Sequence, residues 1–176
     1  MNYKSYWKNT QKSKISGAPK NKSFFEREKF VLKEALIHVT IISAIIFAIA
    51  VFAIDFEQIG LVLIGAGLLP LISLKLTGEK IKESVSEMVF GFVNTGLITA
   101  MAIIGFNVEG IIGAVIGVAL GDAITEGYSG ILEGEVSDLL LKWKIKEKID
   151  PLNSSLGKMA GALFGGGVVL LIFSLI

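Results

Sequence analysis

The chain has no cysteine and only one histidine, His38, among its 176 residues. The first absence excludes disulfides, thiolate metal sites and cysteine nucleophiles, and it leaves the redox compartment undetermined. The second absence excludes metal sites built from several imidazoles, so a site for a hard cation must use oxygen ligands.

Charged residues are scarce as well, at 19% of the chain against 52% hydrophobic residues. This balance is too apolar for a soluble protein, and it predicts an all-α bundle of transmembrane helices with the lipid bilayer as its main partner. Phosphate-loop, HExxH and GxSxG motifs are missing. We therefore expect no enzyme, no cofactor and no bound nucleic acid.

Five apolar runs predict five membrane spans, because each is long enough, or nearly so, to cross the bilayer. They cover residues 34–54, 59–74, 88–106, 110–132 and 157–176. The second run is short and contains Pro70, so it is either kinked or re-entrant. Residues 1–33 are predicted to form a basic cytoplasmic arm ending in an interfacial helix, and residues 34–176 the membrane domain. Within that domain, residues 133–149 are predicted to form a cytoplasmic helix.

The positive charges predict the orientation of these spans. All 17 Lys and Arg residues fall within residues 1–33, 75–87 and 133–158, whereas the other two loops carry only acidic charges. Since cytoplasmic loops accumulate Lys and Arg, the N-terminus is predicted inside and the C-terminus outside. An integral protein of a prokaryotic plasma membrane fits this arrangement.

Glycine recurs at every fourth position in the last two predicted spans. The two ridges are Gly113, Gly117 and Gly121, and Gly157, Gly161 and Gly165. Small residues at this spacing let another backbone approach closely, so each ridge is predicted to pack on a neighbouring helix or on a second subunit.

The fourth predicted span carries a stripe of polar residues on one helix face. Asp122 and Glu126 lie four residues apart, and Ser129 and Glu133 continue the same face. At 1.5 Å per residue from Gly110, the two carboxylates lie roughly 18 and 24 Å deep in a core of about 30 Å. Both are therefore predicted to be inside the membrane.

An acidic side chain at the membrane centre costs about 2.5–3.5 kcal/mol, so the pair requires compensation. No Lys or Arg lies in any predicted span core. A bound ion, protons or water is then the expected partner, and Asp122 and Glu126 become the predicted metal ligands. Glu133, Glu135 and Asp138 would collect ions at the inner mouth.

The third predicted span offers polar groups at a matching depth. Asn94 and Thr99 lie roughly 9 and 16 Å from its cytoplasmic edge. Asn94 is predicted either to supply an oxygen ligand or to form an interhelical hydrogen bond. Met159 is either a soft ligand or a packing residue.

The segments ESVSEMVFGFVNTGLITAMAIIG and IGVALGDAITEGYSGILEGEVSD resemble the first two spans of the vacuolar iron transporter family. The resemblance covers about residues 83–138. It implies a dimer with five spans that moves ferrous or manganous ions out of the cytosol against protons.

Two positions depart from that family's pattern. Asn94 stands where the family has an aspartate, and Glu126 where it has a methionine, while Asp122 matches an acidic position. The matching spans come first in the family, whereas two spans precede them here, so the arrangement would be permuted.

Two functions follow from these observations. The first is a homodimeric transporter of a divalent cation such as iron or manganese, coupled to protons. The alternative is a small structural or accessory subunit whose glycine ridges pack into a larger membrane complex.

Overall fold

The computed structural model describes residues 24–142 and 151–175, with side chains for residues 29–128 and 151–175. Every regular element within these ranges is a helix, which confirms the all-α part of the prediction. The elements are α2 (Phe24–Phe52), α3 (Ile59–Ala66), α4 (Leu68–Leu76), the 3₁₀ helix η1 (Ile81–Ser84), α5 (Val85–Lys142) and α6 (Pro151–Ser174). Most of the predicted basic arm, residues 1–23, lies outside the described residues.

Four helical stretches in the described part of the chain are long and apolar enough to cross a membrane. They are Lys29–Phe52, Ile59–Leu76, Ile81–Tyr128 and Pro151–Ser174. Large apolar side chains such as Phe47 and Ile111 lie on the outside of the bundle, with 71% and 78% of their surface exposed. An outer surface of this kind suits lipid, so the chain is an integral membrane protein.

Helix α2 is continuous from Phe24 to Phe52. Residues 24–33, which the sequence assigned to an interfacial helix, therefore run directly into the first apolar stretch. His38 lies on this helix, and its Nδ1 is 2.8 Å from the backbone oxygen of Glu34. The imidazole is thus satisfied within its own helix.

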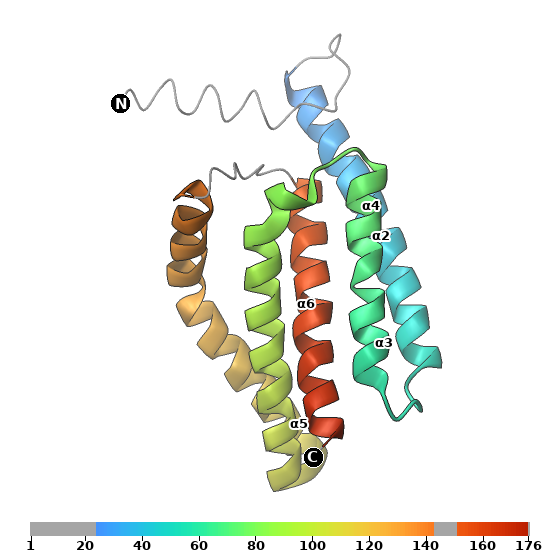
Figure 1. Ribbon diagram of the computed structural model, residues 1–176, viewed down its shortest axis with the longest axis vertical. Coiled ribbons are helices and arrows are strands. Elements are labelled where there is room, and N and C mark those ends of the chain that lie inside the picture. The colour runs from blue at the N-terminus through green and yellow to red at the C-terminus, as the bar shows by residue number, and fades with distance from the viewer. Residues whose placement is uncertain (1–23, 143–150, 176) are drawn as a thin grey trace.

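Helices α3 and α4 follow one path along the bundle, with a break at Gly67 (Figure 1). Pro70 has no N–H group, so it cannot bond the carbonyl of Ala66 one turn earlier. Gly67 keeps near-helical angles, φ −61° and ψ −17°, and its N–H reaches the oxygen of Leu63. Of the two alternatives from the sequence, the structure has the kinked one.

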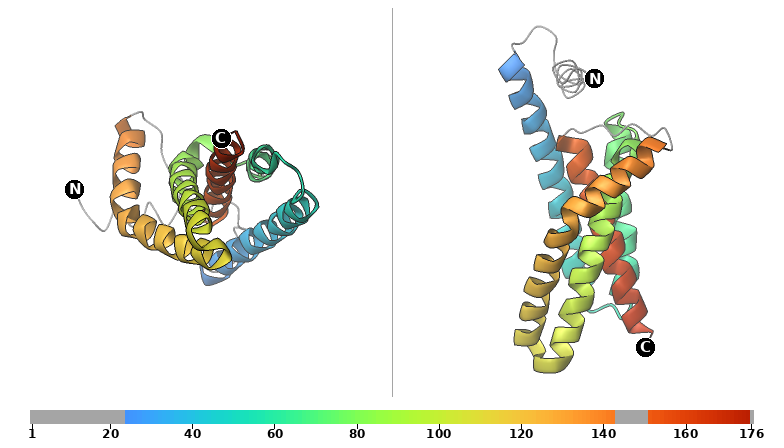
Figure 2. Two further views of the ribbon diagram at one scale, coloured as in Figure 1. Left: turned by 90° about the horizontal axis from the view of Figure 1, so that it is seen from below. Right: turned by 90° about the vertical axis from the view of Figure 1, so that its left-hand side faces the viewer.

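Helix α5 is a hairpin of two limbs. Glu109 has φ −136° and Gly110 has φ +59°, a left-handed value that favours glycine. At this turn the chain reverses, and the second limb (residues 111–142) runs back beside the first limb (residues 85–108), as Figures 1 and 2 show. The predicted break between residues 106 and 110 coincides with the turn.

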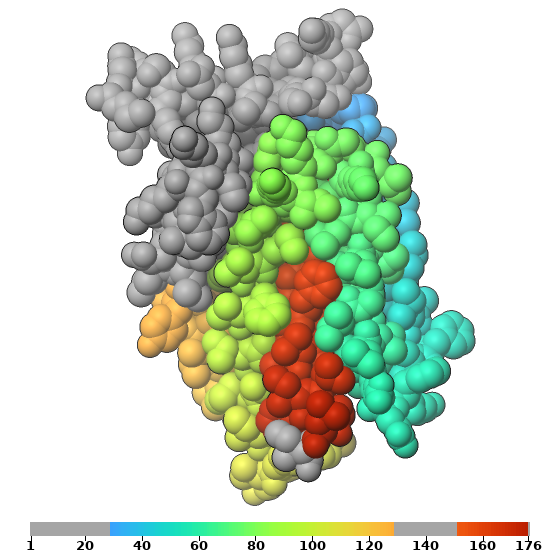
Figure 3. Space-filling model, in the orientation of Figure 1, coloured from blue at the N-terminus to red at the C-terminus, as the bar shows by residue number. Residues whose placement is uncertain are grey.

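Helix α6 forms the centre of the bundle, between the first limb of α5 and the α3–α4 pair (Figure 3). A Cβ on Gly161 would overlap the carbonyl oxygen of Met88 in α5. On the other side, a Cβ on Gly167 would lie 2.8 Å from the carbonyl oxygen of Gly60 in α3. Glycine therefore allows α6 to contact two neighbours at backbone distance.

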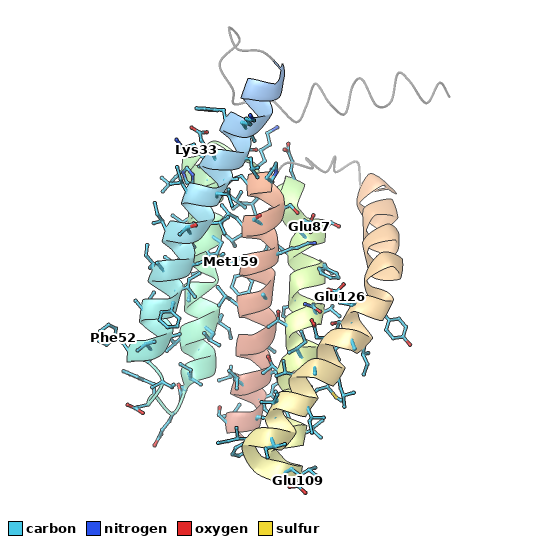
Figure 4. All side chains as sticks on the ribbon, turned by 180° about the vertical axis from the view of Figure 1, so that it is seen from behind. Lys33, Phe52, Glu87, Glu109, Glu126 and Met159 are labelled. Atoms are coloured by element: carbon cyan, nitrogen blue, oxygen red, sulfur yellow. The ribbon has the colours of Figure 1, made fainter. Side chains whose placement is uncertain are left out.

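The small hydrophobic core lies beside α6, near the end of the bundle at which η1 is located (the η1 end). Leu74 and Leu156 are fully buried, and Ile42 of α2 completes the cluster. Met159 packs against it as a partly buried side chain (Figure 4). Of the two predicted roles for Met159, the structure shows packing.

Candidate functional site

The two limbs of α5 meet along the glycine ridge predicted in the fourth span. A Cβ on Gly113 would overlap the oxygen of Gly105, one on Gly117 would overlap the oxygen of Met101, and one on Gly121 would lie 2.9 Å from the Cα of Ile98. The ridge therefore packs against a helix of the same chain. These contacts fix the register of the two antiparallel limbs, since residues later in the second limb pair with residues earlier in the first limb.

Extending that register by one turn places Asn94 level with Thr125. Asn94 lies four residues before Ile98, so it is on the face of the first limb that meets the second limb. Thr125 is 98% buried, and its hydroxyl donates to the carbonyl oxygens of Gly121 and Asp122. Two polar side chains thus lie level with each other where the glycine contact between the limbs ends.

The side-chain oxygen of Asn94 is buried and has no hydrogen-bond partner. An orphaned buried acceptor costs about 1–3 kcal/mol, and such groups are rare in folded proteins. The alternative role from the sequence, an interhelical hydrogen bond accepted by this oxygen, is absent from the described part of the chain. An incoming proton donor or cation would satisfy the Asn94 oxygen.

Asp122 and Glu126 flank Thr125 on the second limb. Each directly follows a buried residue of the ridge face, Gly121 or Thr125, and both carboxylates are exposed. Glu126 lies on the second limb just where this limb diverges from the first (Figure 4). The two carboxylates therefore lie at the edge of the contact between the limbs, beside the face of the first limb that carries Asn94. In a single chain they are also exposed at the outer surface.

The described side chains contain no group of three acidic or histidine residues close enough to hold a metal. By the register of the glycine contacts, Asn94, Asp122 and Glu126 lie within about one helical turn of the same level. The side chains of Ser129, Glu133, Glu135 and Asp138 lie outside the described residues, as does the part of the predicted cytoplasmic helix beyond Lys142.

Thr99 belongs to a different face of the first limb. Its hydroxyl donates to the carbonyl oxygen of Thr95 at 2.7 Å, and a Cβ on Gly166 of α6 would lie 3.3 Å from that hydroxyl. The hydroxyl is therefore satisfied locally at the contact with α6. The structure does not bring Thr99 to the side on which Asn94 lies.

Sequence reasoning missed a polar cluster at the η1 end of the bundle. Glu87 of α5 accepts a hydrogen bond from the hydroxyl of Ser154 at 2.7 Å, and its other oxygen lies 3.3 Å from Nζ of Lys158. The same ammonium group lies 4.8 Å from the centre of the Phe90 ring. Lys158 therefore bridges α6 and the first limb of α5.

Lys158 stands at the inner edge of the predicted fifth span, residues 157–176, so it was expected to lie outside the span core. The sequence assigned this lysine to a cytoplasmic segment, whereas α6 begins at Pro151 and contains Lys158 two turns later. Proline is favoured in the first turn of a helix because no partner is needed there for its missing N–H. Pro151 was the available signal, because it marks the start of α6.

A second missed contact closes the same end of the bundle. Asn153 is fully buried in the first turn of α6, and its amide donates to Glu79 at 3.3 Å. Glu79 follows Gly78, whose φ of +80° ends α4 in the left-handed conformation typical of helix C-termini. The contact fixes the α4–η1 connection to the start of α6.

No protein-family model, curated protein or solved structure matches the chain. The resemblance to vacuolar iron transporters therefore rests on the residues of the α5 hairpin alone and stays a prediction.

Proposed function

We propose that the protein is a membrane carrier for a divalent cation, with Asn94, Asp122 and Glu126 as its site inside the membrane. The observation that carries this proposal is the buried oxygen of Asn94, which has no hydrogen-bond partner and lies on the face that meets the limb bearing both carboxylates. Amide and carboxylate oxygens are ligands that hard divalent cations prefer. Water would complete the coordination.

The proposed topology counts each limb of α5 as a separate crossing, which makes five spans. Lys33 lies toward the η1 end of the bundle, and Glu109 lies at the opposite end (Figure 4). Because cytoplasmic loops are rich in Lys and Arg, the η1 end is proposed to face the cytoplasm. The N-terminus is then inside and the C-terminus outside.

A second copy of the chain is proposed to cover the second limb of α5. This limb exposes Val115, Val118 and Asp122 on one face, and in the described residues its ridge packs only on the first limb. A carboxylate facing lipid is costly, so intramembrane acids turn toward protein or water. A homodimer through this limb would place two sets of carboxylates at the subunit contact.

Metal-dependent flux into proteoliposomes tests the proposal. Asp122→Asn and Glu126→Gln are each expected to reduce Mn²⁺ flux at least tenfold, because even outer-shell changes cost about 10–100-fold in metal affinity. Glu57→Gln, an exposed carboxylate in the loop after α2, is the matched control and should leave flux unchanged. Equal flux in all four proteins, with thermal unfolding unaltered, would reject the carrier.

The same exposed limb also suits the second candidate, an accessory subunit of a larger complex. In that case the partner covering Asp122 would be a different protein with a basic or polar group at this depth. Native mass spectrometry after mild detergent extraction separates the two functions. A dimer that retains metal supports the carrier, and a foreign subunit bound in fixed proportion supports the accessory role.

A further inference from the structure

Glu87, Ser154 and Lys158 form a polar cluster, called the Glu87 cluster, whose carboxylate lies on the same limb of α5 as Asn94. Glu87 precedes Asn94 by seven residues, which is two helical turns or about 10 Å along the axis. It stands where the α6-facing side of the limb joins the side that meets the second limb. In Figure 4, Glu87 lies close to the η1 end and Glu126 lies deeper in the bundle.

Two oxygen groups and one positive charge meet in this cluster, because Glu87 contacts both Ser154 and Lys158. Glu87 supplies a carboxylate and Ser154 a hydroxyl, both of which are hard oxygen ligands. The position that a metal would take beside the carboxylate is held by the ammonium of Lys158. Lys158 is a compact positive charge on a flexible stem, so it can leave and return without movement of the backbone.

We propose that Lys158 is a tethered competitor for the transported cation at a second, cytoplasmic-side site formed by Glu87 and Ser154. This inference rests on the proposed carrier function. An arriving cation displaces the ammonium from Glu87, because two positive charges at one carboxylate repel each other. When the cation moves on toward Asn94, the ammonium returns and prevents Glu87 from remaining unpaired.

The exposed fractions of the two side chains fit this exchange. Glu87 is 27% exposed, so its carboxylate is partly withdrawn from water and is stabilised by a positive partner. Lys158 is 42% exposed, which leaves its end group room to move into water. A purely structural ion pair would gain little from such an exposed lysine, because solvent screens it.

Equilibrium binding of Mn²⁺ to the full-length protein in detergent tests the proposal at fixed ionic strength. Lys158→Met removes the competitor and keeps the apolar stem, so Mn²⁺ is expected to bind about tenfold more tightly or at one additional site. Lys158→Arg keeps the charge and should bind Mn²⁺ as the wild type does. In the double variant Glu87→Gln and Lys158→Met, the gain should vanish.

Lys158→Gln removes the same positive charge and keeps a polar end group beside Glu87, so it repeats the test if Lys158→Met unfolds. Weaker or unchanged Mn²⁺ binding in Lys158→Met, with wild-type binding intact and sensitive to Asp122→Asn, would overturn the competitor role alone. If neither the wild type nor any variant binds Mn²⁺, the carrier proposal fails and this inference fails with it.

Discussion

Helix α6 and the second limb of α5 carry the same glycine spacing and have opposite positions in the fold. The ridge on α6 lies at the centre, where Gly161 contacts α5 on one side and Gly167 contacts α3 on the other. Among the residues that the structure describes, the ridge on the second limb contacts one helix, and the rest of that limb exposes apolar side chains and carboxylates. Glycine spacing thus identifies a contact face, whereas the number of contact faces decides whether a helix is central or peripheral.

The largest effect is expected from a methyl group on the central ridge. Gly161→Ala would place a Cβ against the Met88 carbonyl oxygen, so α6 and α5 must separate along their whole contact. Overpacking of this kind costs about 1–3 kcal/mol, and more where backbone rather than a side chain must move. The free energy of unfolding in mixed micelles measures the loss.

Gly65→Ala in α3 is the matched control, since a Cβ there meets nothing within 4 Å. Alanine is favoured over glycine in a helix by roughly 0.5–1 kcal/mol, so this variant should be as stable as the wild type or slightly more stable. If the two alanine variants unfold alike, α6 does not occupy the centre of the bundle.

A smaller effect on stability is expected from the peripheral ridge. Gly117→Ala would press a Cβ onto the Met101 carbonyl and push the second limb away from the first. Since that ridge packs on the first limb alone, the loss should be nearer 1 kcal/mol, and α2, α3, α4 and α6 should remain folded together. The free energy of Mn²⁺ binding should be lost to a greater extent than the free energy of unfolding. The reason is that separation of the limbs moves Asn94 away from the two carboxylates.

Gly127→Ala serves as the control on the same limb, where a Cβ again meets nothing within 4 Å. It should alter neither unfolding nor Mn²⁺ affinity. Global unfolding by Gly117→Ala, to the extent seen with Gly161→Ala, would contradict the peripheral role of the second limb.

The sequence predicted the helices and both glycine faces because apolar length and small-residue spacing are local signals. It did not predict the central place of α6, which depends on contacts between Gly60 and Gly167, more than one hundred residues apart. The hairpin turn at Gly110 was recoverable, since a short polar interruption separates two apolar runs.

The candidate site was predicted in part for the same reason. The spacing of Asp122 and Glu126 indicates a common helix face, and depth alone suggested Asn94 as their neighbour. The Glu87–Lys158 pair joins two helices whose register the sequence does not encode locally. Lys158 was grouped with the cytoplasmic lysines, and the start of α6 at Pro151 was not predicted, so its pairing was out of reach.

The smallest effect on stability is expected at Asn94, and its sign distinguishes a ligand from a structural residue. Asn94→Leu replaces an orphaned buried oxygen with an apolar group of similar size, which should raise the free energy of unfolding by up to about 1 kcal/mol. Mn²⁺ affinity should fall, whereas Asn94→Asp should increase it by adding a charge. A leucine variant that is less stable and binds Mn²⁺ as before would mean that the Asn94 oxygen has a structural partner. The carboxylates of the peripheral limb would then lack the neutral ligand from the first limb on which the carrier proposal depends.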